Sequence, residues 1–103
     1  HIIDLARAHV DCLFYLNSDL CSSSIFNIGT GVPYSVQVVI ASFERISGKR
    51  TVIDYAPRRM GDVDRVYADA SLASTRLNWT AEFGLDSMCQ SAWQFATKID
   101  NWR

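Results

Sequence analysis

The spacing of apolar residues along the chain predicts four helices. In each helical stretch an apolar side chain recurs every three or four positions, which places these side chains on one face of a helix. The predicted helices cover residues 4–17, 35–48, 69–77 and 85–99. Asp4 and Ser35 are candidate N-caps of the first two helices, and Asp69 or Ser71 is the candidate cap of the third. Gly48 suits the end of the second helix, because glycine readily adopts the left-handed conformation found there.

Two short apolar stretches without helical spacing, residues 25–28 and 52–56, predict strands. Gly29 ends the first stretch and Pro57 closes the second. Two strands of this length cannot form an independently stable sheet, so further strands outside this sequence are implied. The residues therefore predict a mixed, helix-rich α/β fold of about four helices and two short strands. The chain begins without Met, which favours a piece of a longer protein.

Composition narrows the classes of protein without choosing one. The chain has 103 residues, of which 49% are hydrophobic and 20% charged, as expected for a folded polypeptide. Its net charge of −1 creates no overall field that would favour nucleic acid or an anionic membrane. No apolar run of about 18 residues and no signal-peptide pattern occurs, so a cytoplasmic protein is expected.

The cysteines and tryptophans are interpreted as structural residues. Cys12, Cys21 and Cys89 have neither an even count nor the spacing of metal ligands, so we expect reduced thiols and no metal site. The tryptophans are expected to anchor the core or a dimer face rather than to stack on a cofactor. They are Trp79, Trp93 and Trp102.

The chemistry of the chain is concentrated in the stretch 56–62, Ala-Pro-Arg-Arg-Met-Gly-Asp. Arg58 and Arg59 can offer planar forks of donors to phosphate oxygens, and Asp62 can accept from a pair of hydroxyls such as a ribose presents. Gly61 permits the turn between them. Taken alone, the same grouping is more often a solvated loop with an ordinary ion pair.

The wider sequence supports the binding interpretation, because several motifs follow one another in a fixed order. They are His1-Ile-Ile-Asp-Leu-Ala6, Phe26-Asn-Ile-Gly-Thr-Gly31, Tyr34-Ser-Val36, Arg58-Arg-Met-Gly-Asp62, Tyr67-Ala-Asp-Ala-Ser71, Leu77-Asn-Trp79 and Gly84-Leu85. Together they resemble the C-terminal part of the UDP-glucose 4-epimerases, members of the extended short-chain dehydrogenase/reductase superfamily. The resemblance covers nearly the whole chain.

The resemblance implies that residues 1–103 are the C-terminal, substrate-binding portion of an NAD-binding Rossmann-type enzyme that interconverts UDP-galactose and UDP-glucose. The N-terminal Rossmann domain, which would bind NAD, lies outside this sequence, and the complete enzyme is expected to be a homodimer. By the same resemblance Arg59 contacts the UDP diphosphate and Asp62 contacts the uridine ribose. The resemblance assigns a role in binding less directly to Arg58.

Val66 is the remaining candidate site residue. At this position the family carries either a bulky tyrosine or a smaller residue that lines the sugar pocket. The small valine then implies room for a 2-acetamido sugar, and with it interconversion of UDP-GalNAc and UDP-GlcNAc. The alternative is that Val66 merely continues a strand-like stretch over residues 63–67.

Two kinds of site are absent from the pattern. The stretch 27–31 lacks the third glycine of a dinucleotide-binding loop, so we interpret it as a turn leading into the helix after Ser35. None of the tyrosines has a lysine four residues later, the spacing of the family's catalytic pair. His1 and His9 are interpreted as capping or surface residues rather than bases.

The sequence therefore predicts that this chain alone is inactive and contains no catalytic residue. Two alternatives stay open beside the UDP-glucose 4-epimerase. One is a related enzyme of the same superfamily that acts on UDP-glucuronate or a UDP-pentose. The other is a non-catalytic interaction or nucleotide-binding module.

Overall fold

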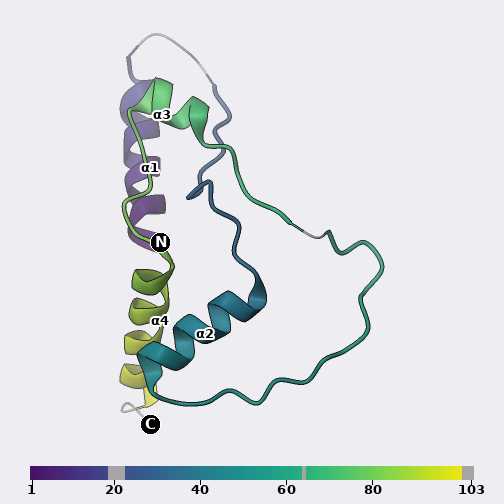
Figure 1. Cartoon of the computed structure of the whole chain (residues 1–103). Helices are drawn as coiled ribbons and strands as arrows, with labels where there is room; N and C mark the ends of the chain where they lie inside the picture. The colour runs from purple at the N-terminus through teal and green to yellow at the C-terminus, as the bar shows by residue number, and fades with distance from the viewer. Residues whose placement is uncertain (19–22, 64, 101–103) are drawn as a thin grey trace. The chain divides into compact units, whose positions relative to one another are not determined.

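The computed structural model describes residues 1–18, 23–63 and 65–100, the last without its side chain, and over this part the chain forms four α-helices (Figure 1). They are α1 (Ile2–Leu16), α2 (Val36–Ser47), α3 (Ser71–Leu77) and α4 (Leu85–Asp100). The chain forms two compact units. Unit 1 consists of residues 1–32 and 67–84 and contains α1 and α3, whereas unit 2 consists of residues 33–66 with α4 and contains α2.

The four predicted helices are confirmed, and local capping explains where α2 begins and ends. Ser35 is its N-cap, and the hydroxyl Oγ accepts a hydrogen bond from the backbone N–H of Val38 at 3.3 Å. Gly48 ends the helix with φ of +67°, a conformation that costs glycine little, and its N–H bonds to the Glu44 carbonyl. The cap predicted for the third helix is wrong: the N-cap of α3 is Ala70, which makes no side-chain capping bond, although the Asp69 carboxylate just before it accepts from the N–H of Ser71 at 2.9 Å.

The prediction that Asp4 caps the first helix is wrong. His1 is the N-cap of α1, and its Nδ1 accepts from the backbone N–H of Ile3 at 3.2 Å. Asp4 lies inside the first turn and is only 2% exposed. Its carboxylate accepts from the backbone N–H groups of Glu82, at 3.2 Å, and Phe83, at 3.0 Å. The carboxylate therefore satisfies donors of a distant segment instead of those of its own helix.

Unit 1 is built around this contact. The indole N–H of Trp79, a side chain 2% exposed, donates to the backbone carbonyl of Asp4 at 3.0 Å. Arg7 donates to the Thr80 carbonyl at 2.8 Å and pairs with Glu82, so the segment 79–83 runs back along α1 (Figure 1). The buried core joins α1, α3 and this segment. Its members are Ala8, Ala73 and Trp79, with Phe26, Ile28, Ala70, Leu77 and Ala81 packed against them.

Unit 2 is held by the packing of α2 against α4. The buried hydroxyl of Ser42 donates to Asp86 Oδ1 at 2.7 Å, and Arg45 pairs with the same oxygen. The hydrogen bonds from Arg45 and Ser42 lower the pKa of the Asp86 carboxyl. At the other end of the interface, the Lys49 ammonium lies 5.1 Å from the centroid of the half-buried Trp93 ring, a cation–π distance.

The two predicted strands are not confirmed. Within residues 1–18, 23–63 and 65–100, the stretches 25–28 and 52–56 are irregular chain and no ladder is formed. Ile25 is 88% exposed and Val52 is 97% exposed. A strand exists only when a neighbouring strand pairs with its N–H and C=O groups, and the described residues supply no such neighbour. The helix-rich part of the predicted fold class is correct.

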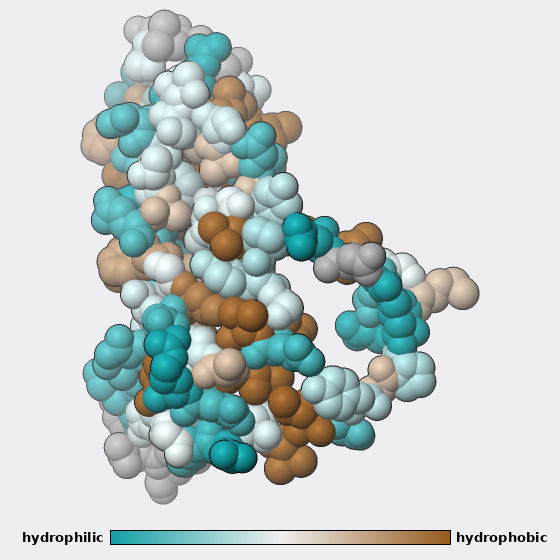
Figure 2. All heavy atoms as spheres, in the orientation of Figure 1, coloured by the Kyte–Doolittle hydropathy of each residue, from teal (hydrophilic) through white to brown (hydrophobic). Residues whose placement is uncertain are grey.

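Many large apolar side chains lie on the surface, as the brown spheres in Figure 2 show. Helix α1 is the clearest case, because exposed apolar residues cover a broad side of the helix, away from the side that carries buried Asp4 and Ala8. They are Ile2, Ile3, Leu5, Val10, Leu13, Phe14 and Leu16. A broad exposed apolar face of this kind typically packs against another part of a protein. These residues therefore require cover that the described chain does not provide.

The structural role predicted for the tryptophans and cysteines is confirmed where they are described. Trp79 is a core residue, and Cys12 and Cys89 are free thiols. Cys21 and Trp102 lie outside the described residues. Among the described residues, no helix is long and apolar enough to cross a membrane, and no cluster of three or more His, Cys, Asp or Glu side chains could hold a metal ion.

Expressed by itself, the chain is expected to associate. Exposed apolar side chains and unpaired extended segments gain by covering one another, so the midpoint of thermal unfolding should rise with protein concentration. Circular dichroism melting and sedimentation over a wide range of concentrations measure this. A monomer with a sharp transition that is independent of concentration would contradict the expectation.

The Asp4 contact predicts a pH dependence of stability. Burial by itself would raise the pKa of the Asp4 carboxyl, but the hydrogen bonds from Phe83 and Glu82 and the charge of Arg7 outweigh it and lower the pKa. A lowered folded-state pKa means that Asp4 stabilises the fold above its unfolded value of about 3.9 and loses this effect as the pH falls through the folded-state pKa.

Asp4→Asn should therefore cost about 1.5–3 kcal/mol of unfolding free energy at pH 7, the range for hydrogen bonds to a charged group. The difference from wild type should shrink at pH 3. Thermal melting of both proteins at one concentration and at both pH values tests this. A difference of the same size at the two pH values would show that ionisation of Asp4 does not stabilise unit 1.

Candidate functional site

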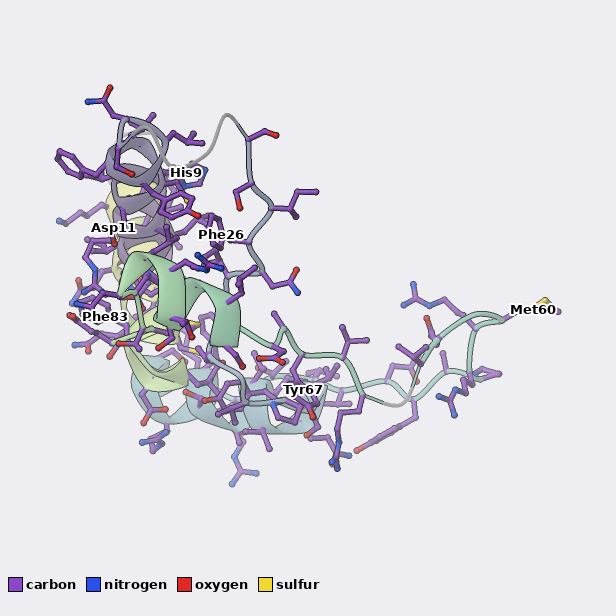
Figure 3. All side chains as sticks on the ribbon, turned by 90° about the horizontal axis from the view of Figure 1, so that it is seen from above. His9, Asp11, Phe26, Met60, Tyr67 and Phe83 are labelled. Atoms are coloured by element: carbon purple, nitrogen blue, oxygen red, sulfur yellow. The ribbon has the colours of Figure 1, made fainter. Side chains whose placement is uncertain are left out.

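The predicted turn after Pro57 is confirmed. The N–H of Asp62 donates to the Arg59 carbonyl at 3.3 Å, closing a four-residue turn. Gly61 has φ of +90°, in the region that favours glycine, so the sequence folds here because the third turn residue has no side chain. Met60 lies at the tip and is fully exposed, and Figure 3 shows it pointing away from the chain.

The turn brings Arg59 and Asp62 together. Arg59 Nε lies 3.3 Å from Asp62 Oδ2, and Arg58 Nη2 donates to the Asp62 backbone carbonyl at 3.1 Å. The Arg59 side chain is 86% exposed and that of Asp62 45% exposed. An ion pair with this exposure contributes less than about 1 kcal/mol, so a ligand can replace it at small cost. From the sequence, the alternative to a binding site is a solvated loop with an ordinary ion pair. That ion pair is present, and it is compatible with ligand binding.

The geometry of the turn suits an anion beside a hydroxyl group. The contact with Asp62 uses Nε of Arg59, and the side chain is 86% exposed, so the two terminal nitrogens of the guanidinium can serve as a fork of donors for a ligand. A carboxylate within the same turn can accept from sugar hydroxyls. A phosphate ester of a sugar carries both groups, so one short turn can hold both parts of such a ligand.

Val66, the third candidate residue, is 74% exposed and lies four residues beyond Asp62. Around it the described residues form no strand, so the alternative of a continuing strand is not confirmed. That Val66 lines a sugar pocket stays a prediction.

The turn over residues 27–31 does not fit a dinucleotide phosphate. A Cβ atom added to Gly29 would lie 2.9 Å from Cβ of Ala68, so this glycine allows close packing rather than the approach of a ligand. Thr30 Oγ1 accepts from the N–H of Val32 at 3.3 Å, and α2 begins only at Val36. A phosphate cradle needs its glycines at the N-terminus of a helix. The residues present therefore do not fit an NAD phosphate site.

The two histidines have the structural roles predicted for them. His1 caps α1, and its ring lies 4.7 Å from that of Phe83. His9 is exposed, and its Nδ1 lies 2.8 Å from the Leu5 carbonyl oxygen.

A cavity of about 420 Å³ lies in unit 1 between the C-terminal parts of α1 and α3, and it was not predicted from the sequence. Its lining residues are Asp11, Phe14, Tyr15, Ser18, Thr75, Arg76 and Leu77. They come from two stretches of sequence far apart, so no local motif could reveal them. Arg59, Asp62 and Val66 are not among its lining residues.

The chain has close relatives among known proteins. It is 43% identical over 103 residues to the UDP-glucose 4-epimerase of Drosophila melanogaster, covering 98% of this chain and 29% of that protein. It is 42% identical over 99 residues to the bifunctional UDP-glucose 4-epimerase and UDP-xylose 4-epimerase 3 of Arabidopsis thaliana, covering 95% of this chain and 28% of that protein. The chain thus spans less than a third of the length of these relatives. No family model matches it.

A solved structure gives the same result for the fold. The crystal structure of UDP-glucose-4-epimerase from Stenotrophomonas maltophila, with bound NAD and formylated UDP-arabinopyranose, matches with a TM-score of 0.91 and 38% identity. The match covers all of this chain and 30% of that protein. The helices described above therefore match part of the fold of an enzyme of the nucleotide-sugar epimerase class.

Within that class the chain is similar to the UDP-glucose 4-epimerases over nearly its whole length. The family resemblance predicted from the ordered motifs is confirmed by these matches.

Proposed function

We propose that the chain is the UDP-sugar-binding, C-terminal part of an NAD-dependent UDP-glucose 4-epimerase. The observation that carries the proposal is the turn 59–62, which presents a guanidinium and a carboxylate together in a chain about 40% identical to such enzymes. In this proposal Arg59 binds the diphosphate of the UDP-sugar and Asp62 accepts from the ribose hydroxyls. The low cost of opening their exposed ion pair supports the assignment.

The proposal gives this chain binding and orientation rather than redox chemistry. NAD would supply the transient oxidation and reduction of the sugar, and its site lies in the N-terminal Rossmann portion of the longer protein. The related structure with bound NAD supports NAD as the cofactor. The packing of Gly29 against Ala68 supports a structural role for the turn 27–31 in place of a dinucleotide-binding one.

A UDP-pentose is the second candidate substrate. One relative is a UDP-xylose 4-epimerase as well as a UDP-glucose 4-epimerase, and the related crystal structure holds a formylated UDP-arabinopyranose. The Arg59 and Asp62 assignments are the same for both substrates, because UDP is common to them. Turnover of UDP-galactose and of UDP-xylose by the full-length protein distinguishes the two candidates.

The test of the enzymatic proposal compares the full-length protein with this chain. With NAD present, the full-length protein should convert UDP-galactose into UDP-glucose, and the chain alone should not. A full-length protein that binds UDP-sugars without converting any of them would favour the non-catalytic nucleotide-binding module instead.

The two adjacent arginines give a matched pair of variants in the full-length protein. Arg59→Ala should weaken UDP-glucose binding by about 2–4 kcal/mol, because it removes a fork of charged donors from a diphosphate. Arg58→Ala should cost less than about 1 kcal/mol, since that guanidinium bonds to the turn backbone in an exposed position. Titration calorimetry measures both. Equal losses would show that the diphosphate has been assigned to the wrong arginine.

The sugar range depends on Val66. If this side chain lines the hexose pocket, Val66→Tyr in the full-length enzyme should lower turnover of UDP-GalNAc by about ten-fold or more and leave UDP-galactose turnover largely intact. The phenol ring would occupy the volume of the N-acetyl group, and overpacking costs about 1–3 kcal/mol. The ratio of the two kcat/KM values decides. An unchanged ratio would show that Val66 does not line the hexose pocket.

A further inference from the structure

The turn that carries Arg59 and Asp62 is positioned by very few contacts. It lies on a long segment that leaves α2 at Gly48, and every described residue from 48 to 63 is exposed. The segment contains neither helix nor strand over its described length. Among the described residues, individual bonds tie this segment to α2, and they can help to fix the turn.

Two such bonds join the segment to opposite ends of α2. At the C-terminal end of the helix, Glu44 Oε1 accepts from the backbone N–H of Thr51 at 2.7 Å. At the N-terminal end, Gln37 Nε2 donates to the hydroxyl oxygen of Tyr55 at 3.3 Å. All four residues belong to unit 2.

The distance along α2 between the two bonded helix residues agrees with the length of chain between their partners, Thr51 and Tyr55. The helix rises about 10.5 Å from Gln37 to Glu44 at 1.5 Å per residue. The extended chain from Thr51 to Tyr55 spans up to about 13 Å. The segment therefore runs back along α2 from the end of the helix toward its beginning, as Figure 1 shows below α2. Of the two bonds, the one at Tyr55 lies nearer in sequence to the turn 59–62.

The connection from Tyr55 to the turn is restricted at Ala56 and Pro57. Pro57 has a fixed φ, and it restricts Ala56 before it to extended conformations. The turn itself is closed by the Asp62–Arg59 backbone bond and by the ion pair between the same two residues. The guanidinium and the carboxylate are thus held together in the turn, and the position of Tyr55 limits where the turn can lie.

We propose that Gln37 and Tyr55 are positioning residues for the UDP-binding turn: their hydrogen bond to each other sets where Arg59 and Asp62 stand relative to α2. The inference rests on the proposed function of that turn. Neither residue touches the substrate in this account. Their contribution is to reduce the number of positions that the turn samples before the ligand binds.

The experiment uses the full-length protein, with UDP-glucose as the probe in titration calorimetry. Tyr55→Phe removes only the hydroxyl oxygen, and Gln37→Ala removes the donor. Each should raise the Kd for UDP-glucose by about three- to ten-fold, the range that the loss of one such hydrogen bond corresponds to. Because both variants break the same bond, the double variant should bind no more weakly than either single variant.

Three matched variants separate positioning from a general loss of structure. Tyr34→Phe removes the same atom from another exposed tyrosine of unit 2 and should leave the Kd unchanged. Gln37→Glu keeps a partner for Tyr55, because the phenol O–H can donate to the carboxylate, and it should restore most of the affinity. Arg59→Ala reports whether the turn binds UDP at all.

In turnover assays, Tyr55→Phe should raise KM and leave kcat and the melting temperature unchanged, because it weakens substrate and transition-state binding equally. An unaltered Kd in Tyr55→Phe and Gln37→Ala, with weak binding by Arg59→Ala, would overturn the positioning role and leave the proposed function intact. Additive losses in the double variant would also overturn it. Unaltered binding by Arg59→Ala would instead contradict the proposed function itself.

Discussion

The buried carboxylate of Asp4 is the contact on which unit 1 depends. It lies in the first turn of α1 and binds the N–H groups of residues 82 and 83, 78 and 79 positions away in the sequence. Together with the bond from Trp79 to the Asp4 carbonyl, it fixes the chain between α3 and α4 along α1. A buried carboxylate without these donors would be strongly unfavourable, so the loop must approach α1 at this place. Two of the ordered sequence motifs, at residues 1–6 and 77–79, thus form one structural contact.

Local signals in the sequence predicted the elements, and distant contacts were missed. The helices follow from apolar spacing, and the ends of α2 follow from Ser35 and Gly48, because these residues act on neighbours within one turn. Asp4 was wrongly assigned as an N-cap, since its partners lie at the other end of the chain. The strands were not confirmed because an apolar run becomes a strand only beside another strand. The apolar stretches 25–28 and 52–56 are present, but the neighbouring strands that would pair with them are not among the described residues.

The same distinction applies to the candidate site. The turn 59–62 was predictable, because its glycine, arginine and aspartate are adjacent in sequence. The bond between Gln37 and Tyr55 joins a residue of α2 to one 18 positions later on an irregular segment, and no sequence pattern predicts such a pair. The structure therefore adds to the sequence mainly by showing what holds the turn. The exposed, weakly paired Arg59 and Asp62 suit binding, because little stability is lost when a ligand separates them.

The central claim is that Arg59 and Asp62 bind the UDP part of a nucleotide sugar, and a crystal structure of the full-length protein with UDP-galactose tests it most directly. The account predicts the Arg59 guanidinium at roughly 2.7–2.9 Å from diphosphate oxygens, the distance of charge-assisted hydrogen bonds, with Asp62 accepting from the ribose. A diphosphate bound by other residues, with Arg59 still paired to Asp62 and in contact with solvent, would contradict it.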